Sequence, residues 1–164
     1  MTATDIHSDL LKQFETRSLS ADGAEALMRH ISEQLHKNLS RYNWVGFYLM
    51  ETSGNALTLG PYVGSFVPTV RIPLDKGLCG AAANSRATVV VNDVSKDPRY
   101  IGSDIVKSNI VAPILLHGNV VAELDIESYF TDTFGPSEQK FIEACAALVA
   151  RSMAKIKLHN FCTS

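Results

Sequence analysis

Two different spacings of apolar residues run along the chain, and they predict helices at both ends with strands between them. Apolar residues recur at helical spacing over roughly residues 3–16, 21–39 and 136–158. Runs typical of strands occupy the following segments between those helices: 43–51, 56–62, 69–74, 87–94 and the two halves of 108–128. Gly77 opens a further short helix, and the turn signal His117–Asn119 predicts a hairpin.

This order of elements predicts an α+β fold with a central, mostly antiparallel, six-stranded sheet. The N- and C-terminal helices are expected to pack on one face of that sheet. The loops and the short helix are expected to lie over a pocket on the other face. No repeat or linker divides the 164 residues, so residues 1–164 are predicted to form a single domain.

The charge and hydropathy patterns argue against nucleic-acid binding, membrane spanning and secretion. The formal net charge is −2 and no basic stripe is present, so nucleic acid is not an expected partner. No run of 18 apolar residues occurs, so no membrane-spanning segment is expected. The first residues are polar and lack the apolar core of a secretion signal, which makes the cytoplasm the expected location.

Three cysteines, at positions 79, 145 and 162, are an odd count with no CxxC pair, which argues against a disulfide framework or a zinc knuckle. The five histidines are scattered without metal-ligand spacing, so neither a metal nor a cofactor is expected. Cys145 shares an apolar helical face with Ile142 and Leu148 and is expected in the core. Cys162 is expected in the C-terminal tail.

Cys79 remains as the candidate for chemistry, in the stretch "DKGLCGAAANSR" where the short helix begins. A thiolate at this position would be stabilised by the unpaired backbone N–H groups of the first turn, by the helix dipole and by nearby Lys76. The residue types leave three roles open for Cys79: a catalytic thiol, a wall of a ligand pocket, or a small residue that fits the packing.

Four segments follow one another in an informative order: "YNWVGFYL" (42–49), "GPYVG" (60–64), "VRIPLDKGLCGAAA" (70–83) and "LDIES" (124–128). They resemble the landmarks of the free methionine-(R)-sulfoxide reductases, a subfamily of GAF domains. A fifth segment, "VNDVSKDPRYI" (91–101), is more similar to sensory GAF domains, which bind small molecules without converting them. The resemblance implies a GAF-like sandwich whose small-molecule ligand is methionine sulfoxide or another amino-acid-like compound.

Carried over residue by residue, the resemblance places the family's nucleophilic cysteine at Ser103, its partner cysteine at Thr69 and a further cysteine at Cys79. The implied catalytic candidate is Cys79, and the implied ligand-binding residues are Trp44, Tyr48, Ser103, Asp104, Asn109, Asp125 and Glu127. Asn109 stands where the family has a glutamate that would hold the substrate amino group.

Two pairs of these residues also have a plainer interpretation. Asp125 and Glu127 lie two apart on one strand face, so they either recognise an amino group or other polar ligand, or they lie on an exposed sheet edge. Trp44 and Tyr48 also share a face, and they are either core residues or the apolar lining of a pocket with the indole N–H as a polar handle.

Apolar residues outside the main stripe of the long helices predict a second buried face. They are Met28, Ala146, Ala147 and Met153. A symmetric homodimer through the terminal helices would bury them, as is common in GAF domains. The alternative is that they pack on each other within one chain.

Sulfoxide reduction by thiols needs a thiolate that attacks sulfur and a second thiol that releases the product as a disulfide. Ser103 and Thr69 supply neither. The sequence therefore favours a small-molecule-binding GAF domain without efficient sulfoxide reduction. The alternative is a divergent reductase that uses Cys79 with thioredoxin or an external thiol such as glutathione. A dimerisation module without a ligand is a third interpretation.

Overall fold

The computed structural model describes the backbone of residues 2–20 and 22–162, and the side chains of residues 2–20 and 22–155. Its helices are α1 (Ala3–Ser18), α2 (Ala24–Asn38), α3 (Gly77–Ser85) and α4 (Pro136–Cys162), with a 3₁₀ turn, η1, at Val94–Lys96. Its strands are β1 (Trp44–Met50), β2 (Ala56–Gly64), β3 (Arg71–Pro73), β4 (Val89–Val91), β5 (Ser108–Leu116) and β6 (Asn119–Ser128). Residue 21, the predicted start of the second helix, and the side chain of Cys162 lie outside the described residues.

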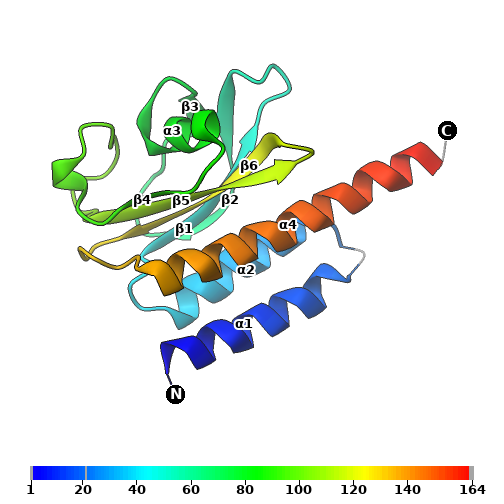
Figure 1. Cartoon of the computed structure of the whole chain (residues 1–164), viewed down its shortest axis with the longest axis horizontal. Helices are drawn as coiled ribbons and strands as arrows, with labels where there is room; N and C mark the ends of the chain where they lie inside the picture. The colour runs from blue at the N-terminus through cyan, green and yellow to red at the C-terminus, as the bar shows by residue number, and fades with distance from the viewer. Residues whose placement is uncertain (1, 21, 163–164) are drawn as a thin grey trace.

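The six strands form one sheet in the order β3-β2-β1-β6-β5-β4, in which every neighbouring pair is antiparallel (Figure 1). The predicted α+β fold with a six-stranded antiparallel sheet is confirmed. β5 and β6 are joined by a two-residue turn in which His117 and Gly118 have φ angles of 52° and 79°. A tight hairpin turn of this kind needs left-handed backbone at both positions, and glycine adopts it without steric cost.

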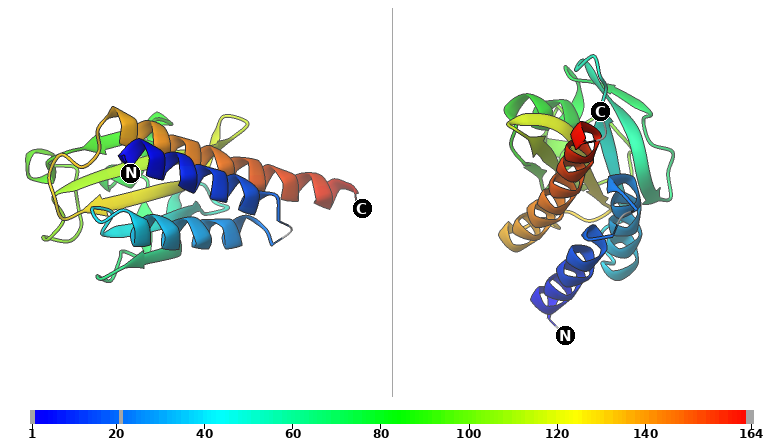
Figure 2. Two further views of the ribbon diagram at one scale, coloured as in Figure 1. Left: turned by 90° about the horizontal axis from the view of Figure 1, so that it is seen from below. Right: turned by 90° about the vertical axis from the view of Figure 1, so that its right-hand side faces the viewer.

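The long helices lie on one face of the sheet, as predicted. α2 and α4 cover that face, and α1 packs on α2 and α4 on the side away from the sheet (Figure 2). The core between sheet and helices is made of apolar side chains such as Phe14, Ile31, Phe47, Leu124, Ile126 and Ile142. Among the helices that the structure describes, none is both long and apolar enough to cross a bilayer.

The second apolar face of the helices is largely used within the chain. Met28 and Ala146 are 3% and 4% exposed and belong to the helix-side core, and Met153 packs against that core. Ala147 is the exposed member of the predicted set. Burial against α1 and the sheet therefore explains most of a pattern that was interpreted as an interface, and the homodimer stays a prediction.

The opposite face of the sheet carries α3, the loops and a smaller core. Because side chains alternate along a strand, β1 sends Val45 and Phe47 toward the helices and Trp44 and Tyr48 toward α3. β6 alternates in the same way and occupies the middle of the sheet. The two central strands therefore form the floor beneath α3 and the loops.

Candidate functional site

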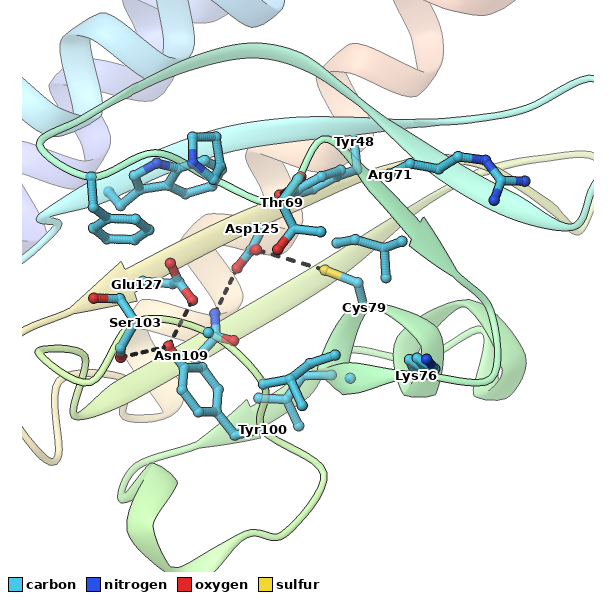
Figure 3. A pocket seen from close by; sticks show the side chains of 18 of the residues that line it. Tyr48, Thr69, Arg71, Lys76, Cys79, Tyr100, Ser103, Asn109, Asp125 and Glu127 are labelled. Carbon is cyan, nitrogen blue, oxygen red and sulfur yellow. Dashed lines mark hydrogen bonds between the residues drawn. The ribbon is translucent and has the colours of Figure 1, made fainter.

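A cavity of about 620 Å³ lies on this floor, bordered by α3, the loop before β3 and the loop of residues 97–107. The predicted site residues that line it are Trp44, Tyr48, Cys79, Ser103, Asn109, Asp125 and Glu127. Figure 3 shows Asp125 and Glu127 on the sheet, with Cys79 on α3 facing Asp125. The fold thus brings seven predicted residues from distant parts of the chain to one cavity.

Trp44, 1% exposed, forms the aromatic wall of the cavity. Its cross-strand partner on β2 is Gly64, where a Cβ would lie 2.1 Å from Trp44 Cδ1, so the missing side chain makes room for the indole. The rings of Tyr48 and Phe66 stack beside it, with centroids 6.2 and 5.9 Å away. The buried indole Nε1–H has no hydrogen-bond partner, and a ligand atom that accepts a hydrogen bond would satisfy it.

Three carboxyl side chains, Glu123, Asp125 and Glu127, alternate along β6 and lie on one face of the sheet, where they form what we call the carboxyl row. Asp125 and Glu127 line the cavity, and Glu123 is buried next to them without lining it. They are 0%, 6% and 8% exposed on a central strand, so the interpretation of an exposed sheet edge is wrong. Burial raises the pKa of all three carboxyl groups, because their ionised forms lose hydration. Within the described side chains, none of the ion pairs involves this row.

Asp125 is held by neutral donors. Asn109 Nδ2 donates to Asp125 Oδ1 at 2.6 Å, and Cys79 Sγ–H donates to Asp125 Oδ2 at 3.6 Å. Asn109 Nδ2 also donates to the carbonyl oxygen of Ile126 at 2.9 Å. The amide of Asn109 therefore stabilises the carboxylate of Asp125 and brings no charge of its own to the cavity.

Cys79 sits in the first turn of α3, but its surroundings favour the thiol over the thiolate. The side chain is 5% exposed, and burial followed by the nearby carboxyl groups of Asp125 and Glu123 raises the pKa of Cys79 well above its ordinary value. The expectation that the helix dipole and Lys76 would stabilise a thiolate is wrong. Lost hydration and acidic neighbours outweigh the positive end of a short helix, and Lys76 itself is exposed.

The loop of residues 97–107 turns Ser103 toward the cavity and Asp104 away from it. Ser103 and Thr69 both line the cavity, so hydroxyl groups stand at both positions where the resemblance implied thiols. Asp104 is exposed and borders a separate, more open depression. Its predicted place in the pocket is therefore wrong, because an irregular loop has no periodicity from which the inward-facing residue could be read.

Sequence reasoning missed one residue that lines the cavity, Tyr100, and one buried residue beside the lining, Glu123. The hydroxyl group of Tyr100, at the cavity, lies 3.2 Å from Glu127 Oε1 and 3.3 Å from the carbonyl oxygen of Ser103, and it can donate to either (Figure 3). A Cβ at Gly102 would lie 2.5 Å from that hydroxyl, so the glycine lets the ring fold under the loop. Glu123 had a visible signal, since the alternation in "AELDIES" puts three acidic residues on one strand face.

The other thiol whose side chain is described lies far from this chemistry. Cys145 is fully buried in the helix-side core, on the opposite side of the sheet from Cys79, as its helical spacing predicted. Both cysteines are free. In the part of the chain that the structure describes, no group of three or more His, Cys, Asp or Glu side chains is arranged to hold a metal ion.

A six-stranded antiparallel sheet with long helices on one face and a cavity under a short helix on the other defines a GAF domain. The family model of the GAF domain matches residues 23–153, and the chain belongs to that family. Within it, the chain is related to the free methionine-R-sulfoxide reductases. It is 36% identical to the free methionine-R-sulfoxide reductase of Saccharomyces cerevisiae over 132 residues, which are 79% of this chain and 71% of the yeast protein.

Two further comparisons cover nearly the whole chain. Protein YtsP of Bacillus subtilis is 32% identical over 147 residues, 89% of this chain and 90% of that protein. The X-ray structure of a free methionine-R-sulfoxide reductase from Neisseria meningitidis in complex with its substrate matches with a TM-score of 0.91 at 26% identity. That match covers 97% of this chain and 95% of the neisserial chain.

Proposed function

We propose that this GAF domain binds a small molecule in its cavity without reducing methionine sulfoxide efficiently. One observation carries the proposal: the described side chains around the cavity include a single thiol, Cys79, which is buried and donates a hydrogen bond to Asp125. The thiolate is the attacking species in thiol chemistry, so a thiol with a raised pKa is a weak nucleophile. Ser103 and Thr69 cannot form the disulfide that would release a product.

The cavity itself supports the binding half of the proposal. Its volume of about 620 Å³ falls in the range of small-molecule sites, about 300–1,000 Å³. It combines the aromatic wall of Trp44 and Tyr48 with a few converging polar groups, which is typical of such sites. The expected homodimer and cytoplasmic location are part of the proposal and rest on the sequence pattern.

A divergent reductase is the second candidate, favoured by the reductases among the relatives and by the position of Cys79 on the cavity wall. In that reaction Cys79 would attack the sulfoxide sulfur, take its oxygen as a sulfenic acid and release methionine. Two external thiols such as glutathione would then reduce the sulfenic acid, with one disulfide and one water as products.

An assay of NADPH consumption separates the two candidates. The wild type, Cys79→Ser, and the double variant Thr69→Cys/Ser103→Cys are given resolved epimers of methionine sulfoxide. The reductant is first thioredoxin with its NADPH-dependent reductase and then glutathione with its NADPH-dependent reductase. We expect no wild-type turnover above the Cys79→Ser control and a measurable rate from the double variant, because it restores both thiols. Adding Asn109→Glu should raise that rate further. Robust wild-type turnover that Cys79→Ser abolishes would establish the reductase instead.

A further inference from the structure

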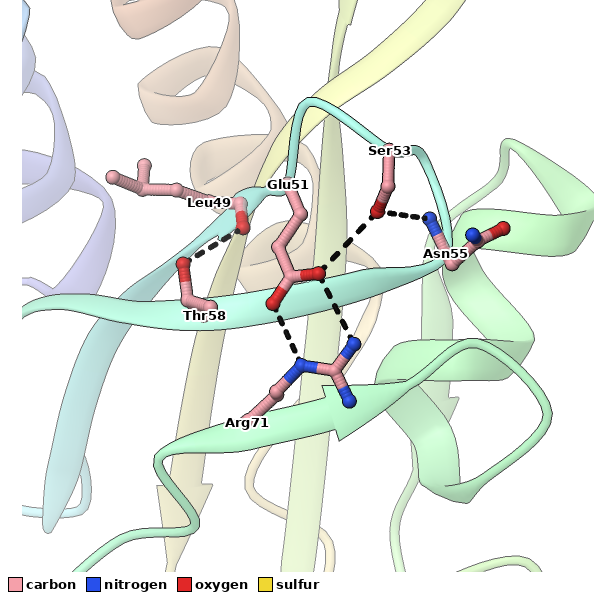
Figure 4. A network of polar contacts seen from close by, with 6 residues as sticks. All are labelled: Leu49, Glu51, Ser53, Asn55, Thr58 and Arg71. Carbon is pink, nitrogen blue, oxygen red and sulfur yellow. Dashed lines mark hydrogen bonds and ion pairs between the residues drawn. The ribbon is translucent and has the colours of Figure 1, made fainter.

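The cavity has acidic groups on its floor, and neither basic residue among its described lining residues forms an ion pair with them. Two basic residues, Arg71 and Lys76, line it. Arg71 Nε and Nη2 donate to Glu51 Oε1 and Oε2 at 2.7 and 3.1 Å (Figure 4), and Figure 3 shows the guanidinium directed away from Asp125 and Glu127. Lys76 is exposed at the mouth. Neither neutralises the carboxyl row.

The other polar groups packed around the row are neutral or acidic. Tyr48 of β1, Cys79 of α3 and Tyr100 of the loop each have a raised pKa, chiefly through burial, so they carry no charge near neutral pH. Asn109 of β5 is an amide. A buried carboxylate without a cation is costly, so the described surroundings leave room for a positive charge that comes from outside the chain.

A second unsatisfied group lies beside the row. The indole Nε1–H of Trp44 is buried without a partner, and Trp44 is the cross-strand partner of Glu127. A ligand that satisfied both residues would carry a positive charge and, within reach of it, a neutral oxygen that accepts a hydrogen bond. The carboxyl row would thus bind the positive charge of such a ligand, and the indole N–H of Trp44 would bind its oxygen.

We propose that the cavity selects an organic monocation, an alkylammonium with a neutral oxygen acceptor, over a zwitterionic amino acid, and that its binding expels protons from the carboxyl row. The inference rests on the proposed function, since it assigns a ligand class to the same cavity. A zwitterion would bring a carboxylate as well as an ammonium group. The two basic side chains that line the described cavity are Arg71, which is paired with Glu51, and Lys76, which is exposed to solvent.

The loss of protons follows from charge. In the empty cavity, burial raises the pKa of Glu127 to about 9, so this carboxyl group keeps its proton near neutral pH. An ammonium group placed against it lowers that pKa, and the proton leaves to solvent. An alkylamine has a pKa of about 10 and stays charged well above neutral pH. Affinity is therefore expected to rise with pH up to the point at which the ligand itself loses its proton.

Trp44 is the single tryptophan of the chain, so its fluorescence reports on the cavity directly. Three probes share a methylsulfinyl-alkyl chain and differ in the charged groups they carry: 3-(methylsulfinyl)propylamine is a cation, methionine sulfoxide a zwitterion, and 4-(methylsulfinyl)butanoate an anion. We expect the amine to bind at least about tenfold more tightly than the zwitterion, a difference of about 1.4 kcal/mol. The butanoate is expected not to bind.

Calorimetry in two buffers of different ionisation enthalpy measures the proton release. Glu127→Gln removes an ionisable group that faces the cavity but keeps an oxygen for the Tyr100 hydroxyl, and Glu33→Gln on the exposed face of α2 is the matched control. We expect the wild type and Glu33→Gln to release protons on binding the amine. Glu127→Gln is expected to release fewer protons and to bind at least about tenfold more weakly.

Each of the other outcomes contradicts a separate part of the inference or of the proposed function. A zwitterion that binds as tightly as the amine, or more tightly, contradicts the inference but leaves the binding function standing, and would place the carboxylate at the N-terminus of α3, where Lys76 makes no side-chain cap. Binding of the amine without proton release contradicts the linkage. If none of the probes binds, the inference and the binding function fail together, whereas turnover of the zwitterion contradicts the proposed function alone.

Discussion

Glu123 is an acidic residue inside the described core. Its side chain is fully buried, and neither carboxyl oxygen has a hydrogen-bond partner. Its raised pKa means that the folded protein holds this proton more tightly than the unfolded chain does. Folding therefore becomes less favourable as pH rises above the ordinary glutamate value of about 4.3. We predict that Glu123→Gln raises the free energy of unfolding by about 1–3 kcal/mol at pH 8 and by much less at pH 5.

Urea unfolding of Glu123→Gln at both pH values checks this prediction. Glu33→Gln, on an exposed face, should stay within about 0.5 kcal/mol of the wild type at either pH. Equal stabilisation by Glu123→Gln at pH 5 and pH 8 would show that the ionisation of Glu123 is not the cause.

At the scale of single residues, some features of the site could be predicted from the sequence and others could not. The alternation along "AELDIES" was sufficient to put three carboxyl groups on one face, because strand geometry has a period of two. No such period exists in the loop of residues 97–107, so the inward turn of Ser103 and the outward turn of Asp104 could not be predicted. The pKa of Cys79 depends on burial by segments distant in sequence, which a helix-start motif does not contain.

At the level of elements, the pairing of β1 with β2 depends on the missing side chain at Gly64. A Cβ there would lie 2.1 Å from the rigid indole of Trp44, so Gly64→Ala must displace the ring. We predict a loss of about 1–3 kcal/mol in the free energy of unfolding, with a shift in Trp44 emission. Gly135→Ala is the control, since a Cβ at Gly135 would meet nothing within 4 Å. Chemical unfolding followed by fluorescence measures both, and an unchanged emission spectrum in Gly64→Ala would contradict the prediction.

Elements were the most predictable level of this chain. The terminal helices, the hairpin at His117–Asn119 and the strand order along the chain follow from local periodicity and turn residues. Sheet order does not, because antiparallel partners distant in sequence are chosen by packing. β6 lies beside β1 in the middle of the sheet, so Asp125 and Glu127 lie on the cavity floor and not on an exposed sheet edge.

For the whole molecule, oligomeric state is the open prediction. α1 and the sheet already cover Met28 and Ala146, so an interface between copies would use what remains exposed on α4, including Ala147. We predict a dimer in light scattering at micromolar concentration that Ala147→Glu converts to monomer. Val67→Glu, at an exposed position on the cavity mouth, should leave the dimer intact. A monomeric wild type would exclude the interface.

The contact between Arg71 and Glu51 bears on how proteins with this architecture could diverge. Both side chains are solvent-accessible, and a pair of this kind contributes at most about 1 kcal/mol, so its loss would be tolerated. Glu51 does not line the cavity, yet its replacement by a neutral residue would leave the guanidinium of Arg71 unpaired at the rim. That guanidinium could then bind the carboxylate of a ligand. Two related proteins with identical cavity-lining residues could therefore bind ligands of different charge, and a comparison of those lining residues would not distinguish them.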